Sequence, residues 1–158
     1  EKRALTKILR EFLKNNKVEA IAIATAGAVN HENSKVIGSQ GNLPKDYSST
    51  EFKKIFEEKY NLPFFLENDA NAAAFAEYKI GAAKGSRYSI TVTLGTGVGS
   101  GIVVNGQLVY GHDGFAGELG HVIIVRGEEG RPCGCGRTGC VECYCSATGV
   151  AKTAREWL

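Results

Sequence analysis

The sequence predicts an α/β protein, and three observations support this. Short apolar runs of strand length alternate with longer segments in which apolar residues recur every three or four positions. Apolar residues make up 43% of the 158 residues, which is enough for a packed core. No internal repeat or low-complexity segment interrupts the pattern. A chain of this length forms one domain or parts of two.

The first half of the chain is predicted to contain two helices and two buried strands. Helical spacing of apolar residues covers 3–15 and 50–60. Continuous apolar runs over 18–24 and 62–67 favour strands. The stretch 28–50 is rich in Asn, Gly and Ser, and we expect loops there.

The second half begins with an Ala-rich segment that favours a helix. Its expected elements are a helix over 70–80, strands over 88–94, 101–110 and 121–126, and a helix from about 146. Within the second of these strands, Asn105-Gly106 is a typical signal for a tight hairpin turn.

Charge and hydropathy exclude several classes of partner. The net charge is +2 with scattered Lys and Arg, so this segment is not expected to bind nucleic acid. No apolar run approaches the roughly 20 residues that span a bilayer, and no apolar stretch follows Glu1-Lys2-Arg3 as in a signal peptide. We therefore expect a cytoplasmic protein. Both ends read as helix without start or stop signals, which predicts a part of a larger protein.

Three of the five cysteines form the strongest local motif. Cys133, Cys135 and Cys140 lie within eight residues and are interleaved with glycines, which allow a short loop to close around one ion. Tetrahedral zinc in structural sites is commonly held by three Cys and one His. The spacing therefore predicts a zinc-binding knuckle rather than a disulfide framework, with free thiols in a turn as the alternative.

The fourth zinc ligand is predicted to be His121, twelve residues upstream of the first cysteine. His31 and His112 are the other candidates. Cys143 and Cys145 are interpreted as small packing residues, although either could replace Cys140 as a ligand.

A glycine-rich segment between two expected strands is the second motif. It has neither the Gly-Lys-Ser/Thr ending of a Walker A loop nor the following helix of a dinucleotide-binding fingerprint. Such a hairpin can still offer backbone N–H groups to an anion, and Thr96 could add a hydroxyl. The alternative is a tight turn without a ligand. The residues concerned are Gly95, Thr96, Gly97 and Gly99.

Asp69 stands where an expected strand gives way to a helix. A carboxylate there can cap the helix N-terminus. It can also act as a general base, because ligands of α/β proteins bind at the carboxyl ends of strands. Both interpretations stay open on sequence alone.

A set of polar residues lies close in sequence to the expected metal ligands. Glu118 precedes His121 by three residues, and Glu142 follows Cys140 by two, so a metal would bring both carboxylates near one point. Carboxylates and Asn amides form the paired hydrogen bonds that recognise hexoses, and Asn42 and Asn68 are further candidates. Each of these residues, taken alone, is typical of a solvated protein surface.

Four motifs in this order resemble the ROK family of repressors, open reading frames and kinases. They are Glu67-Asn68-Asp69-Ala70-Asn71, Leu94 to Gly101, Gly117-Glu118-Leu119-Gly120-His121, and Cys133 to Glu142. The resemblance implies a partial actin-like ATPase (ribonuclease H-like) two-domain sugar kinase fold. Residues 1–66 would end a small N-terminal domain, and 67–158 would begin a large C-terminal domain containing the zinc loop 121–142.

The resemblance also implies roles for individual residues. Asp69 matches the catalytic base. The sugar-binding positions correspond to Asn42, Asn68, Glu118, His121 and Glu142; the structural zinc ligands to His121, Cys133, Cys135 and Cys140; and the ATP phosphate loop to Gly95, Thr96, Gly97 and Gly99. Mg²⁺ would enter with ATP. Ser100 departs from the family, which usually has Gly at that position.

The function implied is ATP-dependent phosphorylation of a hexose, with glucose giving glucose 6-phosphate. A sugar-responsive repressor of the same family and an N-acetylmannosamine kinase are the alternatives. Partners would be the hexose and ATP, with no membrane, and the family pattern implies a homodimer or homotetramer. The family is about twice as long as this chain.

Overall fold

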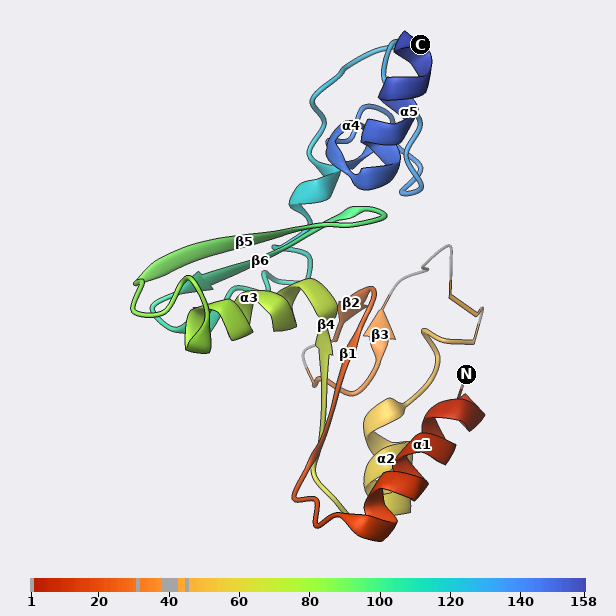
Figure 1. Ribbon diagram of the computed structural model, residues 1–158, viewed down its shortest axis with the longest axis vertical. Helices are drawn as coiled ribbons and strands as arrows, with labels where there is room; N and C mark the ends of the chain where they lie inside the picture. The colour runs from red at the N-terminus through yellow and green to blue at the C-terminus, as the bar shows by residue number, and fades with distance from the viewer. Residues whose placement is uncertain (1, 31, 38–42, 45) are drawn as a thin grey trace.

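The computed structural model describes residues 2–30, 32–37, 43–44 and 46–158 (Figure 1). Two residues singled out above, His31 and Asn42, lie outside this part of the chain. Among the described residues, none of the helices combines the length and the apolar character needed to cross a membrane. The elements follow one another as an α/β chain, as predicted.

The first part is built on two parallel strands with helices beside them. Strand β1 (Ile21–Thr25) pairs with β4 (Phe64–Asn68) in the register Ile21 to Phe64. Helices α1 (Lys2–Asn15) and α2 (Phe52–Tyr60) lie on one side of this pair (Figure 1). The rings of Phe56 and Phe64 stack with centroids 4.9 Å apart inside the core. All five helices and strands predicted between 3 and 80 thus begin and end within three residues of their expected ends.

The stretch predicted as loops contains a short antiparallel pair. Strands β2 (Ala28–Val29) and β3 (Val36–Ile37) face each other across a turn. The side-chain Oδ1 of Asn30 accepts hydrogen bonds from the N–H groups of Ser34 (2.9 Å) and Lys35 (3.0 Å). Polar side chains that suggested a loop therefore build the turn of a hairpin.

The second part is a three-stranded meander. Strand β5 (Tyr88–Leu94) pairs antiparallel with β6 (Val98–Val104), and β6 pairs with β7 (Gln107–Leu108). The predicted strand 101–110 is thus two strands, separated by the expected turn at Asn105-Gly106, where both residues have positive φ (51° and 83°). Helix α3 (Asp69–Ile80) covers one face of the meander (Figure 1).

Close packing between α3 and β6 requires a glycine. A Cβ at Gly101 would lie 2.5 Å from the Cβ of Ala74 and 3.0 Å from the carbonyl oxygen of Ala70. The helix therefore lies directly on the strand that leaves the glycine-rich hairpin. This contact places the N-terminus of α3 beside the hairpin.

The strand predicted over 121–126 is wrong. A 3₁₀ turn, η1 (Leu119–His121), is followed by irregular chain, and within 122–126 the only ladder contact in the described structure is an isolated bridge from Ile123 to Cys140. The apolar run Val122 to Ile124 is exposed, and the cysteine loop, not a sheet, is its partner. An apolar run becomes a strand only where another strand is available.

Two helices complete the chain. Helix α4 (Glu142–Cys145) was not predicted, whereas α5 (Ala147–Trp157) begins at the expected place. Ser146 caps α5, because its hydroxyl accepts a hydrogen bond from the N–H of Gly149 (3.0 Å). The domain division predicted between residues 66 and 67 falls inside β4 and stays a prediction.

Candidate functional site

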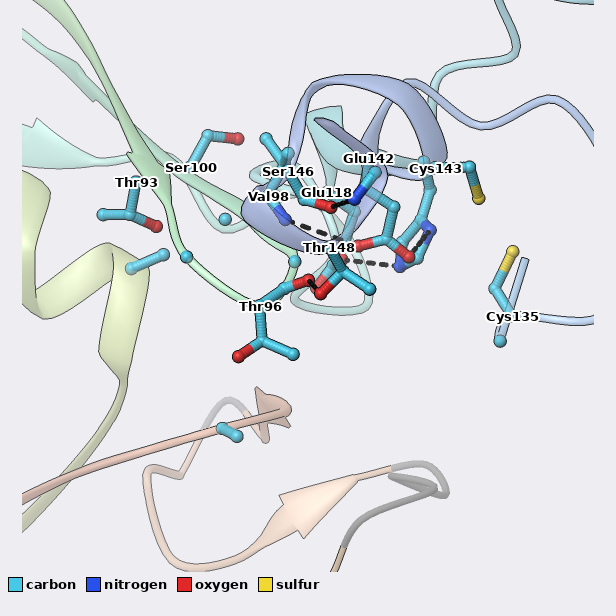
Figure 2. Close-up of a pocket in the computed structure, with 18 of the residues that line it drawn as sticks. Thr93, Thr96, Val98, Ser100, Glu118, Cys135, Glu142, Cys143, Ser146 and Thr148 are labelled. Atoms are coloured by element: carbon cyan, nitrogen blue, oxygen red, sulfur yellow. Dashed lines mark hydrogen bonds and ion pairs between the residues drawn. The ribbon is translucent and has the colours of Figure 1, made fainter. Parts of the chain in front are cut away.

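One large cavity of about 1170 Å³ lies between β4, the glycine-rich hairpin and the cysteine loop (Figure 2). It collects predicted site residues from four separate segments of the chain. Those that line it are Asn68, Asp69, Gly95, Thr96, Gly97, Gly99, Glu118, His121, Cys135 and Glu142. Cys133 and Cys140 are buried behind this surface.

At the end of β4, Asp69 is not the residue that caps the following helix. Asn68 is the N-cap of α3: its Oδ1 accepts from the N–H of Asn71 (3.0 Å), and its Nδ2 donates to the carbonyl of Gly27 (3.0 Å). One amide hydrogen of Asn68 then remains for a ligand. Asp69 is exposed, and one of its oxygens accepts from the N–H of Ala70 (2.9 Å). Within the described residues its second oxygen has no partner, so it can accept a proton or a hydrogen bond.

Glu67, quoted above only within a motif, is the centre of a network beneath Asp69. Its carboxylate accepts from the hydroxyl of Tyr110 (2.6 Å), the N–H of Asn68 (2.8 Å) and the side-chain amide of Asn71 (3.3 Å). Burial, and then the bond to Glu67, raise the pKa of Tyr110 above its usual range. The network fixes the strand end that carries Asp69. The sequence signal that could have identified Glu67 is an acidic residue at the end of a predicted buried strand.

The glycine-rich hairpin is compact because side chains crowd it. A Cβ at Gly97 would lie 2.8 Å from the carboxylate of Glu142, and one at Gly99 would lie 2.7 Å from the hydroxyl of Thr93. Gly95 donates its N–H to the carbonyl of Gly97 (3.0 Å). Among the described residues, the N–H groups of Thr96 and Gly97 make no hydrogen bond. They are available to an anion.

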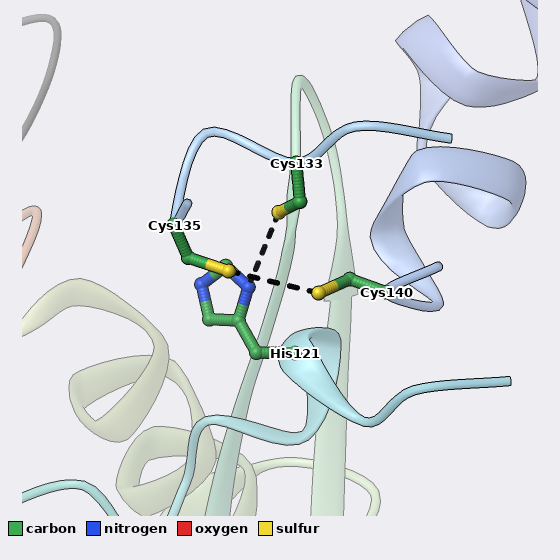
Figure 3. A group of neighbouring side chains, drawn as sticks. All are labelled: His121, Cys133, Cys135 and Cys140. Atoms are coloured by element: carbon green, nitrogen blue, oxygen red, sulfur yellow. Dashed lines mark hydrogen bonds between the residues drawn. The ribbon is translucent and has the colours of Figure 1, made fainter. Parts of the chain in front are cut away.

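His121, Cys133, Cys135 and Cys140 form a cluster that could hold a metal ion (Figure 3). Their ligand atoms all lie within 4.8 Å of one another. The Sγ atoms of Cys135 and Cys140 are 3.7 Å apart, and Nδ1 of His121 is 3.6 Å from Sγ of Cys133. Zinc–ligand bond lengths and tetrahedral angles give edges of about 3.8 Å for S to S and about 3.6 Å for S to N. The cluster therefore has the size and donor set of a Cys₃His zinc site.

The other candidate ligands in the described chain do not belong to this cluster. His112 is exposed and pairs with Asp113 at 2.7 Å. Cys143 faces the carbonyl oxygen of Pro132 (3.6 Å), and Cys145 is exposed. Cys140 therefore keeps its predicted place.

Local electrostatics differ among the cysteines. Desolvation raises the pKa of the Cys133 and Cys140 thiols. Desolvation acts in the same direction on Cys135, but hydrogen bonds from Arg137 outweigh it and lower its pKa to about 6. Of these three thiols Cys135 is the most easily deprotonated, and deprotonation is what metal binding requires.

His121 lies between two carboxylates. Its Nε2 is 3.6 Å from Oε2 of Glu118, and its Nδ1, on the side of Cys133, is 3.6 Å from Oε1 of Glu142. The second oxygen of Glu142 accepts from the N–H of Val98 (3.4 Å) in the hairpin. One glutamate therefore joins the cysteine cluster to the glycine-rich hairpin (Figure 2).

The chain matches known proteins over nearly its whole length. Residues 2–158 match the model of the ROK family. A glucokinase of Streptomyces coelicolor is 41% identical over 89% of the chain, and a xylose repressor of Bacillus subtilis is 37% identical over 84%. A crystal structure of a ROK family glucokinase from Streptomyces griseus, in complex with glucose and AMPPNP, covers 98% of the chain at 36% identity with a TM-score of 0.82.

The chain spans less than half the length of each of these relatives. It covers 43% of the glucokinase, 33% of the repressor and 48% of the crystallised chain.

Proposed function

The chain belongs to the ROK family, and from its site we propose that the protein transfers the terminal phosphoryl group of ATP to a hexose, with glucose as the preferred substrate. One observation carries the proposal. A single cavity is lined by a carboxylate at the end of a parallel strand and by a glycine-rich hairpin with free N–H groups. It is also lined by carboxylate, amide and imidazole groups that can bond sugar hydroxyls. These are the parts that phosphoryl transfer needs, since it depends on positioning and on stabilising charge.

In the proposed site the sugar lies beside the cysteine cluster. Glu118, Glu142 and the Nε2 of His121 would bind its hydroxyls, together with the remaining amide hydrogen of Asn68. A zinc ion fits the cluster and would be structural, because all four protein ligands are present. Holding Nδ1 of His121 on the metal would leave Nε2 for the sugar and fix the orientation of the ring.

Asp69 is the proposed general base. Its free oxygen would accept the proton of the attacking hydroxyl as the sugar oxygen forms a bond to the γ-phosphorus. The bond from this phosphorus to the bridging oxygen breaks, and ADP leaves. The N–H groups of Thr96 and Gly97 would bind phosphate oxygens. Mg²⁺ arriving with ATP would offset part of the phosphate charge.

A sugar-responsive repressor is the second candidate, supported by the similarity to the xylose repressor. A repressor needs sugar binding but neither a base nor a phosphate loop. Asp69 and the complete Gly95 to Gly99 hairpin therefore favour the kinase. For the substrate, similarity to a glucokinase and to a structure with bound glucose supports the proposal of glucose.

The test compares wild type with Asp69→Asn in the protein as its gene encodes it. Wild type is expected to phosphorylate glucose with Mg-ATP, and the variant to lose activity by a factor of about 10² to 10⁴, the usual contribution of a general base. Asp113→Asn, at an exposed carboxylate that does not line the cavity, is the matched control. N-acetylmannosamine and fructose complete the panel. Sugar binding without turnover on any hexose would contradict the kinase and favour the repressor.

A further inference from the structure

Helix α5 begins against the glycine-rich hairpin, although the two are distant in sequence. The N–H of Ala147, its first residue, donates to the carbonyl of Gly95 (2.9 Å). The hydroxyl of Thr148 donates to the carbonyl of Thr96 (3.0 Å) across 52 positions of the chain (Figure 2). Two consecutive hairpin carbonyls are thereby held by one turn of helix.

These bonds determine where the hairpin N–H groups point. A trans peptide is planar, and its C=O and N–H groups point in opposite directions. The carbonyl of Gly95 shares a peptide with the N–H of Thr96, and the carbonyl of Thr96 shares one with the N–H of Gly97. Anchoring both carbonyls on α5 therefore directs both N–H groups away from the helix. It also keeps two carbonyl oxygens from facing a phosphate.

Arg131 holds α5 to the segment that leads into the cysteine cluster. Its guanidinium donates to the carbonyls of Cys143 (2.9 Å) and Gly149 (3.2 Å) and pairs with Glu156 at 2.5 Å. The guanidinium also stacks over the ring of Tyr144 with 4.7 Å to the centroid. The start of α5 is thus held by further contacts besides those with the hairpin.

We propose that α5 positions the Gly95 to Gly99 hairpin for the phosphates of ATP, and that Thr148 is the positioning residue through which it acts. This proposal rests on the proposed kinase function. Thr148 acts on the nucleotide through the shape of the hairpin. Its loss therefore weakens nucleotide binding more than sugar binding.

The first test replaces the hydroxyl with a methyl group. Thr148→Val is expected to raise KM for ATP and the Kd for Mg-AMPPNP about 3- to 10-fold, the effect of one net hydrogen bond. KM for glucose and metal content should stay unchanged. Thr148→Ser, which keeps the hydroxyl, should restore wild-type values. Thr153→Val is the matched control, because its hydroxyl bonds the carbonyl of Gly149 inside α5 (3.0 Å) and not the hairpin.

A second variant removes the backbone bond. Ala147→Pro deletes the N–H that holds Gly95, yet Pro is favoured at the first position of a helix. The preceding residue, Ser146, has φ −69° and ψ 164°, which a following Pro accepts. The helix should therefore persist while nucleotide affinity falls as in Thr148→Val.

The outcomes separate the two proposals. Calorimetry with Mg-AMPPNP reports on the hairpin without turnover, so a wild type that binds nucleotide but transfers no phosphoryl group contradicts only the kinase proposal. Equal changes in KM for ATP and glucose, or the same loss in Thr153→Val, would assign Thr148 a general structural role. Unchanged nucleotide affinity in both Thr148→Val and Ala147→Pro would overturn the positioning role.

Discussion

At the scale of single residues, Ser100 has a buried hydroxyl that bonds two backbone groups of another segment. Ser100 is 3% exposed, and its hydroxyl donates to the carbonyl of Gly117 while accepting from the N–H of Leu119 (3.4 Å). These bonds connect strand β6 to the segment that carries Glu118 and leads to His121. A glycine at this position would have no such bonds.

Ser100→Ala is expected to lower the free energy of unfolding by about 0.5–1.5 kcal/mol, because it removes hydrogen bonds to the half-buried carbonyl of Gly117 and N–H of Leu119, which still bond each other (2.9 Å). The same variant should raise KM for the sugar, since the segment that carries Glu118 is then less constrained. Urea denaturation and steady-state kinetics measure the two effects.

Ser89→Ala is the matched control for this prediction. The hydroxyl of Ser89 is buried on strand β5 but has no hydrogen-bond partner among the described residues. Removing it should leave stability unchanged or slightly raised. Equal losses in Ser89→Ala and Ser100→Ala would mean that the Ser100 hydroxyl contributes only by filling space.

At the scale of elements, the segment from His121 to Cys145 has little regular structure of its own. It contains the end of η1, two isolated bridges and the four-residue helix α4. Few ladder or helix hydrogen bonds hold such a segment, so bound metal is expected to supply much of its stability.

Removal of metal by a chelator should therefore lower the melting temperature and reduce nucleotide and sugar affinity together. Cys140→Ser, at a fully buried position of the proposed ligand set, should reproduce this loss and abolish the binding of one equivalent of zinc. Cys145→Ser is the control, because Cys145 is exposed and outside the cluster. Metal analysis and thermal unfolding measure both. A Cys140→Ser protein with full zinc content would contradict the assigned ligand set.

At the scale of the whole molecule, one face of the meander has no cover among the residues that the structure describes. Helix α3 packs on the other face. Tyr88, Ile90, Val92 and Leu94 alternate along β5 and are each more than half exposed. A contiguous apolar stripe of this kind is typical of a surface that another segment or molecule covers.

A protein consisting of residues 1–158 alone is expected to bind the dye anilinonaphthalene sulfonate through this stripe. The double variant Ile90→Thr, Val92→Thr should reduce dye fluorescence and self-association, since Thr retains β propensity while removing apolar surface. Val150→Thr, at an exposed site on α5, is the control. Fluorescence unaffected by the double variant would place the binding surface elsewhere.

Several features were predictable because they depend on neighbouring residues. The spacing of Cys133, Cys135 and Cys140 indicated a metal cluster, and Asn105-Gly106 indicated the hairpin turn. The motifs also identified the ROK family, to which the chain belongs. Chemistry of this kind is encoded locally, since a short loop or a two-residue turn depends on its own side chains and backbone freedom. The catalytic and sugar-binding roles stay predictions.

Features that depend on residues far apart in the sequence were decided only by the tertiary structure. The run Val122 to Ile124 has the composition of a strand, but it lies beside the cysteine loop, where no strand pairs with it. The capping role that the sequence left open for Asp69 belongs to Asn68, whereas the role of Asp69 as a base stays a prediction. The bond from Thr148 to Thr96 joins residues 52 positions apart. The spacing of residues in the sequence predicts contacts within a few turns of chain. Contacts between distant residues arise only when the packed core brings separate elements together.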